Sequence, residues 1–290
     1  MKHRDGRHYA QCCYVQGRPL EEDLCSATLW PETHKLYGHG NDAYALAACP
    51  FGTCLVSSCK AQTAAAAEVR VWDCRVPQSD LPCVQQLPGH TLTVTQLRFS
   101  PDGCFLLSVS RDRSFTIYAR GSAPLSWTID GKEPELGDER TPAFVPLGSR
   151  AKAHDRIIWS AAWAPAGDMF ATGSRDKAFK VWLFNAEVPA IPAKPAAVVP
   201  GLPAAVTAVA FAPHRSPDGG SVLAVGLENG DIELFSVVVD GQVAAVHRVC
   251  YLLQSSSCVV SARALLHATT SSCTVHTSEC CHTNFDAYLE

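Results

Sequence analysis

Two stretches of this chain, residues 90–118 and 154–182, align with each other without a gap. A motif that recurs at this length marks a repeat unit, and a repeat limits the possible folds more than any other feature of a sequence. The matched positions are a histidine at the start, a Ser-Arg-Asp turn and an aromatic residue at the end. They pair His90 with His154, Ser110-Arg111-Asp112 with Ser174-Arg175-Asp176, and Tyr118 with Trp182.

Each copy is built from short apolar runs separated by turn residues. In the second copy the runs span 159–163, 169–172 and 178–182, with Pro-Ala-Gly and Ser-Arg-Asp-Lys between them. Runs of this length with such turns are typical of a three-stranded antiparallel meander. The same order recurs three more times, with predicted strands at 43–49, 54–59 and 69–73; at 94–99, 105–109 and 115–118; and at 206–211, 222–226 and 231–235.

A fourth strand completes each predicted unit. The candidates are 82–87, 125–129, 196–199 and 243–249, the last preceded by the short run 237–239. The segment 121–150 otherwise reads as a long acidic surface loop, and five prolines in 185–204 exclude a helix there. The sequence therefore predicts an all-β domain over residues 29–249. Its units lie near 35–87, 88–129, 152–199 and 204–249, and residues 1–28 and 250–290 stay unassigned.

Composition excludes several classes of protein. The net charge of −4 is not that of a strongly basic nucleic-acid binder. No apolar run approaches the ~18 residues that span a bilayer. The fourteen cysteines form no Cys-x-x-Cys pair, so no metal or cofactor is predicted. The tail group fits no zinc pattern: Cys273, His276, Cys280, Cys281 and His282. Four other cysteines lie in or beside predicted strands and are expected to act as small apolar side chains: Cys49, Cys54, Cys59 and Cys104.

The repeat resembles the WD-repeat family, whose unit is a four-stranded blade of a β-propeller. In that family a network joins a histidine before the first strand, a hydroxyl on the second, an aspartate in the next turn and a tryptophan on the third. By position, the resemblance assigns it to His154, Thr172, Asp176 and Trp182 in the third repeat. In the second it assigns His90, Ser108 and Asp112, with Tyr118 in place of the tryptophan. The first repeat keeps His39, Ser57 and Trp72, and the fourth only Asn229.

A hydrolase triad is the alternative interpretation of histidine, hydroxyl and aspartate. The group recurs once per repeat, whereas a catalytic site is normally single, and no Gly-x-Ser-x-Gly elbow presents a nucleophile. A buried carboxylate, in contrast, needs hydrogen-bond donors in any case. We therefore expect a stabilising network and no enzyme activity.

About four blades is the lower limit of closed propellers, and more are usual in this family. The sequence thus predicts an incomplete ring. An open arc leaves two blade faces that it cannot bury alone. Other chain segments or partners complete it, or the chain is a truncated product; the sequence leaves both open.

Several ordered stretches resemble the WD-repeat scaffold subunits of the Elongator complex, in the second of their two propellers. They are 28–32, 35–40, 92–96, 99–101, 110–113, 156–160, 173–177 and 224–228. The resemblance implies a non-catalytic scaffold that joins the large subunit to the catalytic subunit of a complex that modifies the wobble uridine of tRNA, with a link to transcription. It implies cytoplasmic and nuclear location, at most indirect contact with tRNA, and no membrane. The alternative is a generic WD-repeat adaptor of another multiprotein complex.

Basic residues flank the turn aspartates of the two best repeats: Arg111, Arg113, Arg175 and Lys177. Equivalent turns of adjacent blades lie on one face of a propeller, so these charges are expected to form a surface for an acidic partner or for phosphates. The alternative is that they only keep the turns soluble. The acidic run 130–139 has the same two interpretations, a docking loop or a solvated one.

Overall fold

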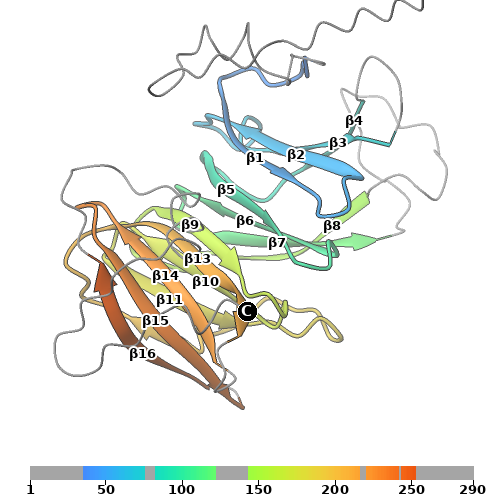
Figure 1. The fold of residues 1–290 in the computed structure, drawn as a ribbon. Coiled ribbons are helices and arrows are strands. Elements are labelled where there is room, and N and C mark those ends of the chain that lie inside the picture. Colours follow the sequence, from blue (N-terminus) through green and yellow to red (C-terminus); the bar gives the residue numbers. More distant parts are fainter. Residues whose placement is uncertain (1–34, 76–81, 122–142, 216–219, 242, 253–290) are drawn as a thin grey trace, which may run out of the picture.

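A computed structural model describes residues 35–75, 82–121, 143–215, 220–241 and 243–252. Within these ranges the regular structure is entirely β, in four antiparallel sheets of four strands (Figure 1). In each sheet the strands pair in chain order, as in a meander.

The strand bounds follow the repeat closely. Blade 1 holds β1 (Ala43–Ala48), β2 (Cys54–Cys59), β3 (Val69–Asp73) and β4 (Cys83–Leu87). Blade 2 holds β5 (Val94–Phe99), β6 (Phe105–Ser110), β7 (Phe115–Gly121) and β8 (Ala143–Arg150). Blade 3 holds β9 (Ile158–Trp163), β10 (Met169–Ser174), β11 (Ala178–Leu183) and β12 (Ala197–Val199). Blade 4 holds β13 (Val206–Arg215), β14 (Ser221–Leu227), β15 (Ile232–Asp240) and β16 (Val243–Leu252).

Blades 2 and 3 share their turn geometry as well as their strands. The first turn of each has a glycine with positive φ, Gly103 at 65° and Gly167 at 74°. The second turn has a basic residue in the left-handed region, Arg113 at 69° and Lys177 at 61°. Left-handed backbone is uncommon outside glycine, so its recurrence at equivalent positions shows that the repeat extends to the backbone.

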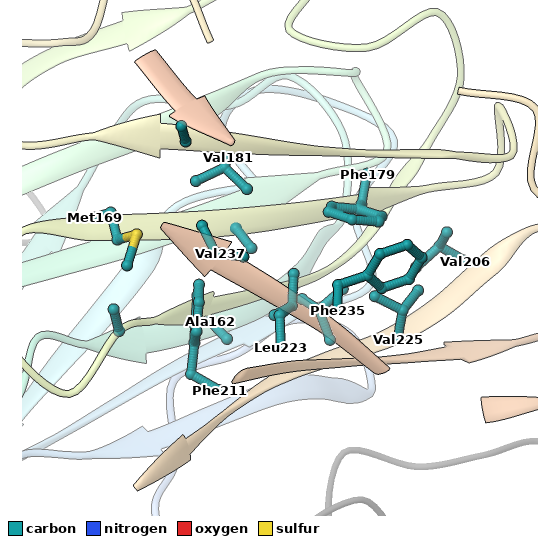
Figure 2. Close-up of a cluster of buried hydrophobic side chains, with 14 of the residues drawn as sticks. Ala162, Met169, Phe179, Val181, Val206, Phe211, Leu223, Val225, Phe235 and Val237 are labelled. Carbon is teal, nitrogen blue, oxygen red and sulfur yellow. The ribbon is translucent and has the colours of Figure 1, made fainter. Parts of the chain in front are cut away.

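The blades lie side by side in chain order, because β1 contacts β5, β5 contacts β9, and β9 contacts β13. Apolar side chains fill the space between them. Figure 2 shows the interface of blades 3 and 4, where Phe179 of β11 and Phe235 of β15 pack with ring centroids 4.8 Å apart. The prediction of an all-β propeller with four blades is confirmed, and the four form an open arc rather than a closed ring.

The fourth strand of blade 2 differs from the prediction. It is β8, which pairs with β7 along its whole length, so residues 143–150 are not the loop that the sequence suggested. Pro146 hid this strand, because proline normally argues against a sheet; it is tolerated here since β8 is an edge strand and a register shift lies opposite it. The predicted strand 125–129 and the acidic run 130–139 lie outside the described residues.

Blade 4 has longer strands than predicted. β13 continues through Pro213 to Arg215, and β15 and β16 form one hairpin reaching Asp240 and Leu252. The extensions 1–28 and 253–290, including the tail cysteines, lie outside the described residues. In the described part of the chain no helix is long and apolar enough to cross a membrane.

Candidate functional site

The four predicted network residues of blade 3 lie together. Trp182 Nε1 donates to Thr172 Oγ1 at 2.9 Å, and that hydroxyl is 2.9 Å from His154 Nε2. His154 Nδ1 lies 2.9 Å from Asp176 Oδ2. The hydroxyl accepts from the indole and has one proton to give, so Nε2 accepts it and Nδ1 carries the proton that is donated to Asp176. The chain of donors therefore selects one tautomer of His154.

Asp176 also ties the turn to the strand before it. Its Oδ2 accepts from the N–H of Asp155 at 3.1 Å, and its Oδ1 accepts from the N–H of Ala178 at 3.2 Å. Burial acts to raise the pKa of this carboxyl, but the hydrogen bonds from His154 and from the N–H of Asp155 hold the pKa below its usual value. The carboxylate is thus the form that the site favours.

Blade 2 builds the same site with one more hydroxyl. His90 Nε2 lies 2.7 Å from Ser108 Oγ, and His90 Nδ1 lies 3.2 Å from Asp112 Oδ2. Ser114 Oγ donates to Asp112 Oδ1 at 2.5 Å and lies 3.0 Å from His90 Nδ1. Sequence reasoning missed Ser114, because Ala178 occupies the equivalent position in blade 3. A hydroxyl two residues after the turn aspartate was the available signal.

Tyr118 replaces the tryptophan of this network and uses its polar end differently. Its hydroxyl donates to the carbonyl of Pro88 at 3.1 Å. Gly89 directly follows Pro88 in the sequence. A Cβ at position 89 would lie 2.5 Å from the Tyr118 hydroxyl oxygen. The Gly-His opening of this repeat therefore has a steric reason, since only glycine leaves room for the ring.

The outer two blades keep less of the network, as the sequence indicated. In blade 1, Ser57 Oγ lies 2.7 Å from His39 Nε2 and accepts from Trp72 Nε1 at 2.8 Å. Burial and then the charge of Arg70 lower the pKa of His39. In blade 4, Asn229 donates to Asp231 across the turn at 2.6 Å.

This geometry offers little to catalysis. Ser108 and Thr172 are each 0% exposed, and the hydroxyls already bond within their own blades. A nucleophile must instead reach a substrate. The stabilising role of these side chains remains a prediction. Among the described residues no group of three His, Cys, Asp or Glu side chains could hold a metal ion.

The four basic residues are exposed, in the turn between β6 and β7 and in the equivalent turn between β10 and β11. We call Arg111, Arg113, Arg175 and Lys177 the basic arc. The turns are anchored, since the N–H groups of Arg111 and Arg175 donate to Thr93 and Ile157 carbonyls at 3.0 and 2.9 Å. Lys177 Nζ also donates to the Pro203 carbonyl at 3.2 Å.

The equivalent turns of the outer blades limit the basic arc. In blade 1, Lys60 is paired with Asp42 at 2.9 Å. In blade 4 the turn carries Glu228 and Asp231. The positive charge is therefore concentrated on blades 2 and 3.

Comparison with known proteins agrees with the fold. The family described as "WD domain, G-beta repeat" matches residues 81–118 and 146–182. The chain is 39% identical over 221 residues to Elongator complex protein 2 of Arabidopsis thaliana, covering 76% of this chain and 24% of that protein. It is 36% identical over 244 residues to Elongator complex protein 2 of Homo sapiens, covering 82% of this chain and 28% of that protein.

The relative of the same name in Saccharomyces cerevisiae is 35% identical over 221 residues, 75% of this chain and 25% of that protein. The chain thus spans about a quarter of the length of the curated relatives that it matches. Over about three quarters of its length the chain is thus similar to a segment of Elongator complex protein 2, and two of its stretches match the WD-repeat model.

Proposed function

We propose that this chain is a non-catalytic scaffold that supports assembly of an Elongator complex. The observation that carries the proposal is the match of about three quarters of the chain to Elongator complex protein 2 from plant, animal and yeast. A propeller arc whose polar networks are turned inward suits a scaffold, because its working surfaces are turns and edges rather than a cleft.

The partners follow from this proposal. We infer contacts with the large scaffold subunit and the catalytic subunit. Any contact with tRNA would be indirect, through the complex that modifies its wobble uridine. Location in cytoplasm and nucleus and the link to transcription belong to the same proposal. In this proposal other subunits catalyse the reaction, and this chain provides a binding surface for them.

The basic arc is the surface that we assign to a partner. Its four side chains are exposed and flank two equivalent turns, so they face an approaching molecule together. An acidic protein surface or a phosphate backbone gains from meeting several fixed positive charges, whereas isolated exposed ion pairs contribute only about 0–1 kcal/mol.

The test is affinity purification of the tagged full chain with mass spectrometry of what it retains. Recovery of the other Elongator subunits supports the scaffold role; recovery of a different complex would replace it with the generic adaptor. The double variant Arg111→Glu and Arg175→Glu should lose partners while keeping its melting temperature.

A matched control reverses two charges outside the basic arc, Lys194→Glu and Arg215→Glu. Both side chains are exposed, and they lie in the segment between β11 and β12 and at the end of β13, away from the turns of the arc. If the double variant of the arc retained its partners as well as this control does, the basic arc would not be the binding surface.

A further inference from the structure

Cys49 carries a thiol whose surroundings differ from those of a structural cysteine. It follows β1, and its Sγ accepts from Thr53 Oγ1 at 3.5 Å and from Arg120 Nη1 at 3.7 Å. Arg120 comes from β7 of the next blade, and its Nη2 also donates to Thr53 Oγ1 at 3.2 Å. A guanidinium and a hydroxyl are thus both directed at one sulfur, an arrangement that favours the thiolate.

A second thiol lies directly across the hairpin. The register pairs Ala48 with Leu55, which sets Cys49 opposite Cys54, and the N–H of Cys49 donates to the Cys54 carbonyl at 2.9 Å. Directly opposed residues of such a pair have Cα atoms about 5.5 Å apart. A disulfide spans Cα separations of about 4.4–6.8 Å, so the hairpin can accept one.

The electrostatics of the two thiols point in opposite directions. Burial acts to raise the pKa of Cys49, but its hydrogen bonds and the charge of Arg120 bring that pKa below its usual value. Burial and then the charge on Cys49 raise the pKa of Cys54 to about 12. Cys49 is therefore the thiol of the pair that ionises more readily, and Cys54 is the one that keeps its proton.

We propose that Cys49 is a peroxide-reactive thiolate and that Cys54 resolves its oxidised form into a cross-strand disulfide. The Cys49 thiolate attacks one oxygen of hydrogen peroxide, the O–O bond breaks, and Cys49 sulfenic acid and hydroxide are formed. Cys54 then attacks the Cys49 sulfur; its own proton and the departing hydroxyl leave as water. Two thiol sulfurs are oxidised, and one peroxide is reduced.

The resolving step is helped by the first one. Once Cys49 is a neutral sulfenic acid, the negative charge that raised the Cys54 pKa is gone, while the favourable charge of Arg120 remains. The pair is also close to the surface: Cys49 is 3% exposed, but Phe51 in the same turn is 67% exposed. A small oxidant suits such a site, and a large one does not.

Two other cysteines provide internal comparisons. Cys104 is exposed, yet burial and the charge of Asp102 raise its pKa. Cys59 is buried in β2, and its thiol donates to the Ala66 carbonyl at 3.3 Å. If exposure decided reactivity, Cys104 would be oxidised first; the proposal requires Cys49 to react before either.

The experiment treats the reduced full chain with hydrogen peroxide, quenches it with an alkylating reagent and maps it by mass spectrometry. Trypsin releases residues 36–60 as one peptide holding Cys49, Cys54 and Cys59. Fragmentation between Cys54 and Cys59 shows which sulfurs are linked. The expected product lacks two hydrogens, links Cys49 to Cys54 and leaves Cys59 alkylated.

Variants separate the roles of the two sulfurs. Cys54→Ser should stop at Cys49 sulfenic acid, trapped with dimedone, and Cys49→Ser should leave Cys54 reduced. Arg120→Met should slow oxidation of Cys49 several-fold, because it removes the positive charge that favours the thiolate. Arg120→Lys should restore part of the rate. Circular dichroism checks that each variant is folded.

Three results would overturn the proposal. They are oxidation of Cys104 or Cys59 as fast as that of Cys49, a disulfide between another pair, and equal rates for the wild-type chain and a folded Arg120→Met variant.

Discussion

Asp176→Ala is the substitution that most directly probes the polar network of blade 3. It removes a carboxylate that accepts from His154 Nδ1 and from the N–H groups of Asp155 and Ala178. His154 is 1% exposed, so its ring N–H loses its partner where water does not reach it. Leaving a buried donor unsatisfied costs about 1–3 kcal/mol.

The two backbone donors add less to the loss. Asp155 is exposed, and its N–H can bond to water, while the Ala178 N–H contributes about 1 kcal/mol. The total is about 3 kcal/mol of unfolding free energy. For a unit of this size each kcal/mol shifts the melting temperature by about 2–4 °C, so the expected decrease is about 6–12 °C.

The assay is thermal and urea unfolding of the full chain, followed by circular dichroism. Asp155→Ala is the matched control, because it removes one carboxylate from an exposed neighbouring position and should cost no more than about 0.5 kcal/mol. If Asp176→Ala had the same melting temperature as Asp155→Ala and the wild type, the network would not stabilise the blade, which would refute the stabilising role that we assign to it.

Two further predictions concern the protonation of Asp176 and the packing of blade 3 against blade 4. The folded pKa of Asp176 lies below the value of about 3.9 for an unfolded aspartate, so its stabilisation is present above that value and is lost as pH falls through the folded pKa. The loss of unfolding free energy caused by Asp176→Ala should therefore be equal at pH 7 and pH 5 and become smaller below about pH 4. A loss that already became smaller between pH 7 and pH 5 would contradict this assignment. Gly173→Ala places a Cβ 2.4 Å from Val206 Cγ1 and should cost about 1–3 kcal/mol in unfolding experiments. Gly40→Ala is its control because nothing lies within 4 Å of that Cβ, and equal stability of the two variants would contradict the packing of blades 3 and 4.

The repeat made most of the fold predictable. Strand positions in blade 3 follow from apolar runs between turn residues, and even the short β12 falls within the predicted 196–199. Prediction failed at β8, where Pro146 lies in an edge strand. Local sequence patterns predict where turns lie and where strands run. Whether a strand tolerates a proline depends on which side of that strand is unpaired, and only the assembled sheet decides this.

The network was predictable for the same reason, and its exceptions were not. The WD-repeat resemblance identified His154, Thr172, Asp176 and Trp182, because blade 3 keeps all four positions at the spacing of the family and blade 2 keeps the histidine, the hydroxyl and the aspartate. Ser114 has no counterpart in blade 3, so no alignment of the repeats could reveal it.

The surroundings of Cys49 were equally hidden in the sequence. Arg120 is 71 residues away in the chain, and only the packing of blade 1 on blade 2 brings its guanidinium to the sulfur. The expectation that Cys49 acts as a small apolar side chain took no account of such a partner.

A chain that works as a scaffold within an Elongator complex should be recovered with that complex. The most direct measurement is the reciprocal purification, in which Elongator is isolated through its large subunit from cells that produce this chain. We expect the chain to be present in fixed ratio to the other subunits and to be depleted when the basic arc is reversed. Its absence from a complex that is otherwise whole would contradict the claim.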